Sequence, residues 1–218
     1  MGKHRIYWTE SNPPAYRKGN NDNHLAIIMQ NPVSQFGDFA DCDSGCVVEH
    51  ILQILHNHDK IRFKDFEWEC AHLINAWPCI DLPTGNWQNQ IDTVRLSVQK
   101  HKQEFLYKIE GKDLILFGEF AEAAYVEVRG RFHGNGIIKL WHPSEMRTRK
   151  IKVFKNYFNS RKAFQSLSDF QVCGDVTVRN GLLAQLYADY IYMRWLGRYG
   201  YSFTFKNFLN KLYENEDQ

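Results

Sequence analysis

Apolar residues follow two spacings along the chain, and each spacing predicts a different kind of element. Residues 24–33 (HLAIIMQNPV) form a short apolar run that ends at Asn31-Pro32, which predicts a buried strand. Over residues 46–56 the apolar positions recur at helical spacing, and the same spacing predicts a long helix over 178–196. The apolar run DLILF at 113–117 predicts a second strand.

The second half of the chain favours further strands. Apolar and polar residues alternate over 124–132 (AYVEVRGRF), and the turn HGNG joins that stretch to 136–141, a pattern typical of a β-hairpin. Residues 149–155 also alternate, and short runs at 168–174 and 201–205 predict strands on either side of the long helix.

The middle of the chain is less regular. Residues 65–77 (DFEWECAHLINAW) predict a helix that Pro78 ends, whereas residues 91–107 mix both spacings and are assigned to neither. Because the strands expected at 113–155 follow one another without a helix between them, a parallel α/β plan fits worse than an antiparallel one. We expect an α+β fold with a ferredoxin-like (RRM-like) antiparallel sheet and inserted strands and helix.

The domain organisation follows from the same pattern. Residues 1–23 are polar and rich in turn residues, so we expect an N-terminal arm there. Residues 24–218 form a single domain in this interpretation, with an insertion at about 60–145. No segment has the apolar length of a membrane span or of a signal peptide, which predicts a cytoplasmic protein without a membrane partner.

Cysteine usage adds little to the chemistry. Five cysteines without a disulfide spacing fit a reducing compartment. Cys42, Cys46 and His50 follow one another at intervals of four residues, so all three side chains would reach one zinc ion if a helix included them. The alternative is that Asp43 or Ser44 caps a helix that begins after Cys42. We expect no metal and no cofactor.

Charge is concentrated in one segment. The net charge is only +2, yet residues 147–162 (RTRKIKVFKNYFNSRK, the basic segment) contain seven cations and no acidic residue. Such a stripe interleaved with aromatic rings predicts a polyanion site, and unpaired RNA suits the rings better than duplex DNA does. The expected phosphate-binding and base-stacking residues are Arg147, Arg149, Lys150, Lys152, Lys155, Tyr157, Phe158, Arg161 and Lys162.

A second candidate site lies where the long helix ends, in the stretch RWLGRYGYSF. Gly197 and Gly200 allow backbone conformations and close approaches that other residues resist. Arg194 and Arg198 are four apart and can grip phosphate oxygens from one side of the helix end. The alternative is an ordinary helix cap with cations that the helix dipole favours.

These segments together resemble the RAMP superfamily of CRISPR-associated RNA-binding proteins. The closer likeness is to the small subunit that binds the crRNA 5′ handle in type IV effector complexes, and it is carried by residues 153–158 (VFKNYF), 173–175 (CGD), the pair Leu182-Leu183 and residues 197–202 (GRYGYS). The resemblance implies a RAMP-like RNA-binding domain without catalytic residues. Its implied partners are crRNA, the backbone and large subunits of a ribonucleoprotein complex, and target DNA through guide pairing in antiviral defence.

Two other functions are consistent with the sequence. Some relatives in that superfamily process crRNA with a histidine base, and the chain has nine histidines, among them His24 and His50. A protein-interaction module without RNA binding is the other alternative, with the aromatic residues serving an interface.

Overall fold

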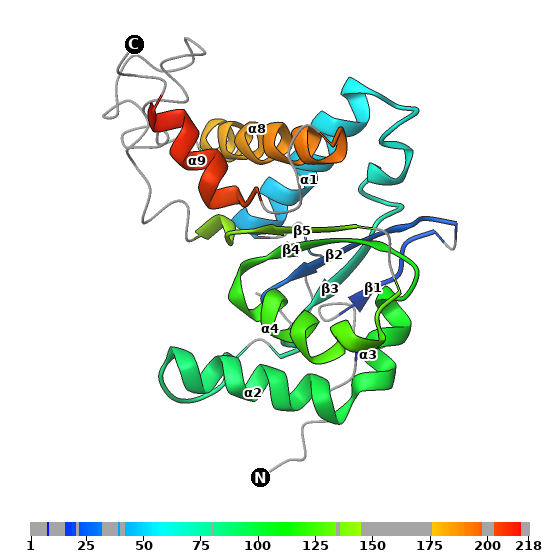
Figure 1. The fold of residues 1–218 in the computed structure, drawn as a ribbon, viewed down its shortest axis with the longest axis vertical. Helices are drawn as coiled ribbons and strands as arrows, with labels where there is room; N and C mark the ends of the chain where they lie inside the picture. The colour runs from blue at the N-terminus through cyan, green and yellow to red at the C-terminus, as the bar shows by residue number, and fades with distance from the viewer. Residues whose placement is uncertain are drawn as a thin grey trace.

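The structure is a computed structural model that describes residues 8, 16–20, 22–31, 39, 42–79, 81–133, 136–144, 176–197 and 203–214. Within those ranges the chain forms helices on both faces of one five-stranded mixed sheet. The sheet order is β1-β3-β2-β4-β5 (Figure 1). The broad expectation of an α and β protein is therefore confirmed.

Strands β2 (Leu25–Met29), β3 (His72–Asn75), β4 (Asp113–Phe117) and β5 (Ile137–Leu140) are parallel to one another. β2 lies at the centre, where Ile27 is opposite Leu73 on one side and opposite Ile115 on the other. Only the two-residue strand β1 (Tyr16–Arg17) runs antiparallel, along the outer edge of β3. Among the described strands, the expectation of an antiparallel sheet is therefore wrong.

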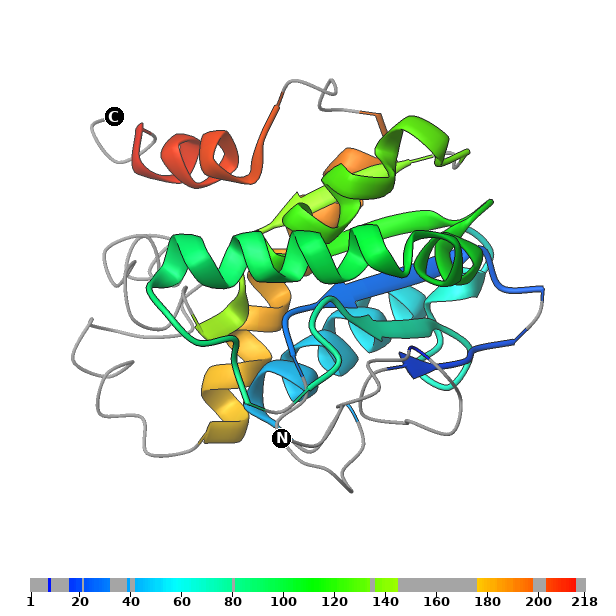
Figure 2. The ribbon, with the colours of Figure 1, turned by 90° about the horizontal axis from the view of Figure 1, so that it is seen from below.

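Helices cover both faces of this sheet. On one face lie α1 (Asp43–His58), α8 (Val176–Trp195) and α9 (Phe205–Glu214), and on the other lie α2 (Trp87–Lys100), α3 (Lys102–Ile109) and α4 (Gly118–Val128) (Figure 1). Figure 2 looks onto the second layer, with α2 in front of the sheet. The described part of the chain is thus a three-layer α/β/α sandwich.

Alternation along the strands separates the two cores. In β2, Leu25, Ile27 and Met29 pack with α1 and α8, whereas Ala26 and Ile28 pack with the α2–α4 layer. Successive side chains of a strand point to opposite faces, so a strand between two helical layers is apolar at every position. This explains why LAIIM is buried throughout.

Three sequence predictions fail for the described residues. Of residues 124–132, expected as a strand, 124–131 lie in α4 and in the 3₁₀ turn η3 (Arg129–Arg131), and Phe132 follows that turn. The expected hairpin is absent as a result, because β5 pairs in parallel with β4 instead. Residues 65–77, expected as a helix, hold the 3₁₀ turn η2 (Lys64–Phe66) and strand β3.

Other predictions are confirmed. The strands at 24–33 and 113–117 correspond to β2 and β4, and the helices at 46–56 and 178–196 correspond to α1 and α8. α1 begins directly after Cys42, but the cap is the Cys42 side chain itself, which accepts from the Gly45 N–H at 3.3 Å. Residues 91–107, left open, form α2 and α3.

Several remaining predictions lie wholly or partly outside the described residues. The expected strands at 149–155 and 168–174 are not described. Of the strand expected at 201–205, residues 203–204 have no regular structure and Phe205 begins α9. From the N-terminal stretch, Trp8 is fully buried, and its indole N–H donates to the Asn75 carbonyl at 2.7 Å. No helix in the described ranges is long and apolar enough to cross a membrane.

Candidate functional site

The carboxyl ends of β2, β3, β4 and β5 lie along one edge of the sheet, which we call the carboxyl edge (left in Figure 1). From β2 the chain continues to β3 on one side of it, and it later returns to β4 on the other side. Ligands of open α/β sheets bind outside the carboxyl ends of the strands at such a reversal of strand order. The carboxyl ends of β2 and β4 are therefore the expected position of a ligand site.

The turn from β4 to α4 has no loop. Gly118 directly follows Phe117 and begins α4. Its φ of +85° is a left-handed backbone conformation that residues with a Cβ rarely adopt. A Cβ on Gly118 would lie 2.9 Å from the His142 Cβ, so the backbone conformation and the neighbour together require glycine. Phe117, the N-cap residue, makes no side-chain capping bond, so the first amides of α4 suit an anionic ligand.

A tryptophan and a carboxylate lie beside that turn. The Trp87 indole N–H donates a hydrogen bond to Glu119 Oε2. The ring of Trp87 stacks on that of Phe120, with ring centroids 4.9 Å apart and planes 21° apart. The first residue of α2 is thereby attached to the first turn of α4 at the carboxyl edge.

His142 marks the end of β5. Its Nδ1 lies 2.7 Å from the Ser144 hydroxyl and accepts from the Ser144 backbone N–H at 3.3 Å. The preceding residue, Trp141, is held through its carbonyl, which accepts from the Tyr187 hydroxyl of α8 at 2.7 Å. The imidazole therefore has a fixed orientation next to Gly118.

The carboxyl ends of β2 and β3 contribute polar backbone and amide groups. Trp77 N–H donates to the Gln30 carbonyl at 2.8 Å, which extends the strand pairing by two residues beyond Asn75. The Trp77 indole N–H in turn donates to the Asp81 carbonyl at 2.8 Å. Partly buried Gln30 and Asn31 therefore stand where the chain leaves β2.

The carboxyl edge thus combines groups of three chemical kinds. They are the amides of a helix start, a partly exposed aromatic ring, and a carboxylate with an oriented imidazole. Such a set can bind a phosphate, stack a base and transfer a proton. In the described ranges no group of three or more His, Cys, Asp or Glu side chains is arranged to hold a metal ion.

Few of the site residues predicted from sequence are described. Arg194, partly exposed, and Gly197 lie at the end of α8, and Gly197 has φ +67° with its N–H donating to the Arg194 carbonyl at 3.0 Å. That geometry is a left-handed helix cap. The other predicted residues lie outside the described ranges: Arg147, Arg149, Lys150, Lys152, Lys155, Tyr157, Phe158, Arg161, Lys162, Arg198 and Gly200.

The candidate zinc ligands and histidine bases are elsewhere. Cys42 caps α1, and burial, together with Cys42, raises the pKa of the Cys46 thiol. His24 precedes β2 at the opposite, amino edge, where its carbonyl accepts from the Asp113 N–H at 2.6 Å. His50 lies within α1. Neither histidine therefore lies at the carboxyl edge.

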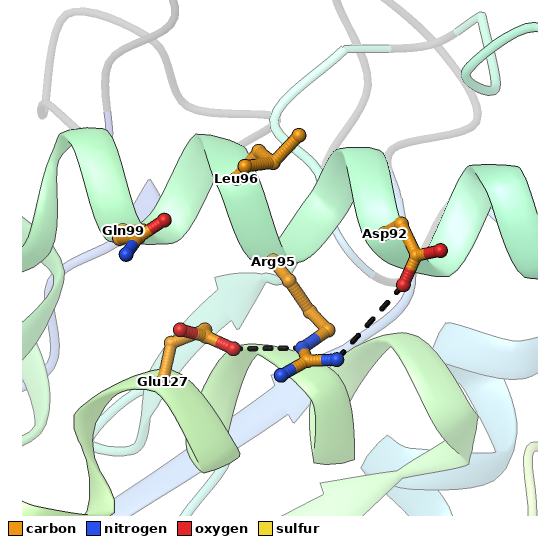
Figure 3. Close-up of a pocket in the computed structure, with 5 residues that line it drawn as sticks. All are labelled: Asp92, Arg95, Leu96, Gln99 and Glu127. Carbon is orange, nitrogen blue, oxygen red and sulfur yellow. Dashed lines mark hydrogen bonds and ion pairs between the residues drawn. The ribbon is translucent and has the colours of Figure 1, made fainter.

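Two surface pockets are lined by charges unsuited to a polyanion. One, of about 300 Å³, lies between α2 and α4, where Arg95 Nε pairs with Glu127 Oε1 at 2.7 Å and its Nη1 lies 3.9 Å from Asp92 Oδ1 (Figure 3). Gln99 and Leu96 complete its lining. A second, of about 510 Å³, lies between α1 and α8 and is lined by residues that include Ile54, His58, Gln185, Asp189 and Tyr192. Carboxylates outnumber guanidinium and ammonium groups in both.

No protein-family model matches the sequence, and no curated protein or solved structure is significantly similar to it.

Proposed function

We propose that the protein binds single-stranded nucleic acid, RNA in particular, at the carboxyl edge of its sheet. One observation carries the proposal: Ser144 lies at this edge after β5, and only two residues separate it from Arg147, the first cation of the basic segment. The cationic sequence is therefore joined covalently to the edge where open α/β sheets bind ligands. Uncapped amides of α4 and the ring of Trp87 add a phosphate-binding and a stacking group there.

The finer form of this proposal is a guide-RNA-binding subunit of a CRISPR effector complex. It is supported by the sequence motifs that resemble the type IV subunit, in particular VFKNYF within the basic segment and GRYGYS after α8. In that role the protein would hold the crRNA 5′ handle, contact backbone and large subunits, and bind target DNA through the guide. The parallel sheet adds no support, because the ferredoxin-like plan expected for the resemblance is antiparallel.

A binding titration tests the broader form. We expect a labelled mixed-sequence single-stranded RNA to bind in a fluorescence anisotropy assay, with an affinity that falls as salt is raised. Changing Arg149, Lys150 and Lys152 together to Glu should weaken binding at least tenfold and flatten the salt dependence. The control is Arg129→Glu with Arg131→Glu, two exposed arginines at the amino edge, which should change affinity less than threefold and is compared per reversed charge.

Two results would contradict the proposal: no binding at low salt, or equal losses from the basic-segment and control variants. The finer form has its own test, which is purification with the proteins of neighbouring genes. A discrete small RNA of repeat-derived sequence should co-elute if the protein holds a guide.

Cleavage of the bound RNA is a second candidate, favoured by the position of His142. This histidine is oriented by Ser144 at the carboxyl edge, whereas His24 and His50 are not at that edge. General-base chemistry requires an oriented imidazole close to the reacting phosphate. Specific cleavage of repeat RNA without divalent metal, lost in His142→Ala and retained in the exposed amino-edge control His133→Ala, would establish it.

A further inference from the structure

We infer that Trp87 is the platform on which an unpaired nucleobase stacks when the protein binds nucleic acid. The inference rests on the proposed function and deepens it, because it assigns a base contact to a residue outside the basic segment. Trp87 lies at the start of α2, which is the end of that helix at the carboxyl edge.

The exposure of the ring is the first argument. Trp87 is 47% exposed, although it stacks on Phe120, which is only 1% exposed. One face of the indole therefore lies against the core, and the exposed area belongs to the opposite face and the rim. A flat aromatic surface with one covered face is the geometry on which bases stack in single-stranded nucleic-acid sites.

The fixed orientation of the ring is the second argument. Its N–H donates to Glu119, and its inner face contacts Phe120, so two residues of α4 hold a side chain of α2. A ring that is already immobilised loses little conformational entropy when a base covers it. The indole N–H has its partner within the protein, so stacking leaves no polar group unpaired.

The neighbourhood of the ring decides between a base and an apolar protein surface. Trp87 contacts the first turn of α4, whose backbone amides attract an anion such as the phosphate that accompanies each base, while the Glu119 carboxylate of the same turn is held by the indole N–H and opposes it. Among the other exposed apolar side chains of the described ranges, Tyr107 on α3 and Ile61 before η2 are elsewhere, and Leu82, 41% exposed, lies in the connection that leads to Trp87. A nucleotide, which joins a flat ring to a phosphate, matches this pair of neighbours.

Anisotropy titration with a labelled single-stranded RNA tests the inference on the full chain. We expect Trp87→Ala to weaken binding about 5- to 150-fold, the range for losing one base stack, with the salt dependence unchanged. Trp87→Phe keeps a stacking ring and should lose about fivefold or less. Tyr107→Ala removes a ring that is more exposed than Trp87. Tyr107 lies on α3, which leads to the amino end of β4, so this variant should change affinity less than twofold.

The outcomes separate this inference from the proposed function. Wild-type protein that fails to bind RNA contradicts both. Wild-type binding that Trp87→Ala leaves unchanged overturns the stacking role alone, and a matching loss in Tyr107→Ala also overturns it. If Trp87→Ala unfolds below the assay temperature, Trp87→Phe provides the test. RNA that stacks on Trp87 quenches its fluorescence, so the decrease in tryptophan fluorescence on adding RNA must be smaller in Trp87→Phe than in the wild type. Capture of a protein partner through Trp87, with RNA affinity unaltered, would also overturn it.

Discussion

The Tyr16 hydroxyl lies 3.3 Å from Nδ1 of His72, and this contact joins the edge strand β1 to β3. On the other side of the ring, His72 Nε2 lies 3.1 Å from the Asn20 carbonyl. A carbonyl only accepts, so Nε2 carries the hydrogen, and the Gly19 backbone N–H donates to Nδ1 at 3.4 Å, so Nδ1 is an acceptor. The imidazole is thus bound in its neutral form. Burial, with a smaller contribution from Lys112, lowers the pKa of His72 from 6.5 to about 4.

We expect the protein to lose stability as the pH falls from about 6.5 towards 4. Between the pKa of His72 in the unfolded chain and its lower pKa in the folded protein, the unfolded state binds more protons, so acid favours unfolding. The full shift corresponds to about 3 kcal/mol in the free energy of unfolding. Urea unfolding at pH 7 and at pH 4.5 measures most of this loss, because the remainder occurs below pH 4.5.

The matched variants for that experiment are His72→Gln and His133→Gln. His72→Gln removes the titrating group, so its stability should fall less between the two pH values even if it is lower at pH 7. Exposed His133→Gln should keep the wild-type pH dependence. Equal pH dependence in all three proteins would show that His72 does not cause the loss.

Substitution of three glycines by alanine distinguishes the cost of a left-handed backbone from the cost of a clash with the added Cβ. Gly130 has no positive φ, and a Cβ added to it would meet no atom within 4 Å. Gly111 has φ +75° with the same open space, whereas Gly118 has φ +85° and the His142 Cβ only 2.9 Å from where its own Cβ would lie. We expect alanine to be nearly neutral at Gly130, to cost about 1 kcal/mol at Gly111 and to cost about 2–4 kcal/mol at Gly118. Denaturant unfolding gives all three values, and a Gly118→Ala loss no larger than that of Gly111→Ala would contradict the crowding.

Phe205 is the more deeply buried of the two aromatic residues that anchor helix α9 to α8, the other being Phe208. Phe205 is 2% exposed, and its ring stacks on Tyr187 of α8 with centroids 5.0 Å apart. Phe205→Ala should cost about 3–5 kcal/mol in the free energy of unfolding, as for other buried phenylalanines. Lys206→Ala, the exposed neighbour, should change it by less than about 0.5 kcal/mol. Similar values for the two variants would mean that α9 is not held by this contact.

Gly197 is expected to act through the backbone. Its left-handed conformation ends α8, so Gly197→Ala should cost about 1 kcal/mol, and Gly197→Asn should cost less because asparagine tolerates that conformation better. Thermal unfolding ranks the two variants. If both keep their stability and both lose RNA affinity, Gly197 acts by close contact with the ligand instead.

One helix decided the sheet type in the sequence prediction. Within residues 124–132, apolar and polar side chains alternate over Val126, Glu127 and Val128. So few positions do not distinguish the two-residue period of a strand from the 3.6-residue period of a helix. The buried positions of α4 extend from Phe120 through Ala124 to Val128, which is the helical spacing. Because the prediction placed a strand where α4 lies, it had no helix between the strands at 113–117 and 136–141. It therefore joined the expected strand at 124–132 to 136–141 as an antiparallel hairpin, whereas α4 is the crossover between two parallel strands.

Strand β3 was hidden for a different reason. All four of its residues are buried, because helices cover both faces of the sheet, so the sequence HLIN shows no alternation. The strands β2 and β4 were predicted correctly, since their longer apolar runs end at clear turn residues.

The residues of the carboxyl edge were missed as a consequence. Glu119 and His142 become candidates only once the strands are known to be parallel, because only then do their ends meet at one edge. The sequence signal for them was present in the Gly118 turn and in the Trp-His-Pro-Ser stretch after β5. The Trp87–Phe120 stack joins residues 33 positions apart in the chain and has no local signal.

The central position of β2 also has a consequence for synthesis of the chain. β2 leaves the ribosome early, but its two partners, β3 and β4, come only at residues 72–75 and 113–117. Until Phe117 has emerged, the wholly apolar segment LAIIM lacks at least one hydrogen-bonding neighbour and resembles an aggregation-prone edge. Nascent chains stalled before Asp113 should therefore need chaperone protection that chains stalled after Leu140 no longer require.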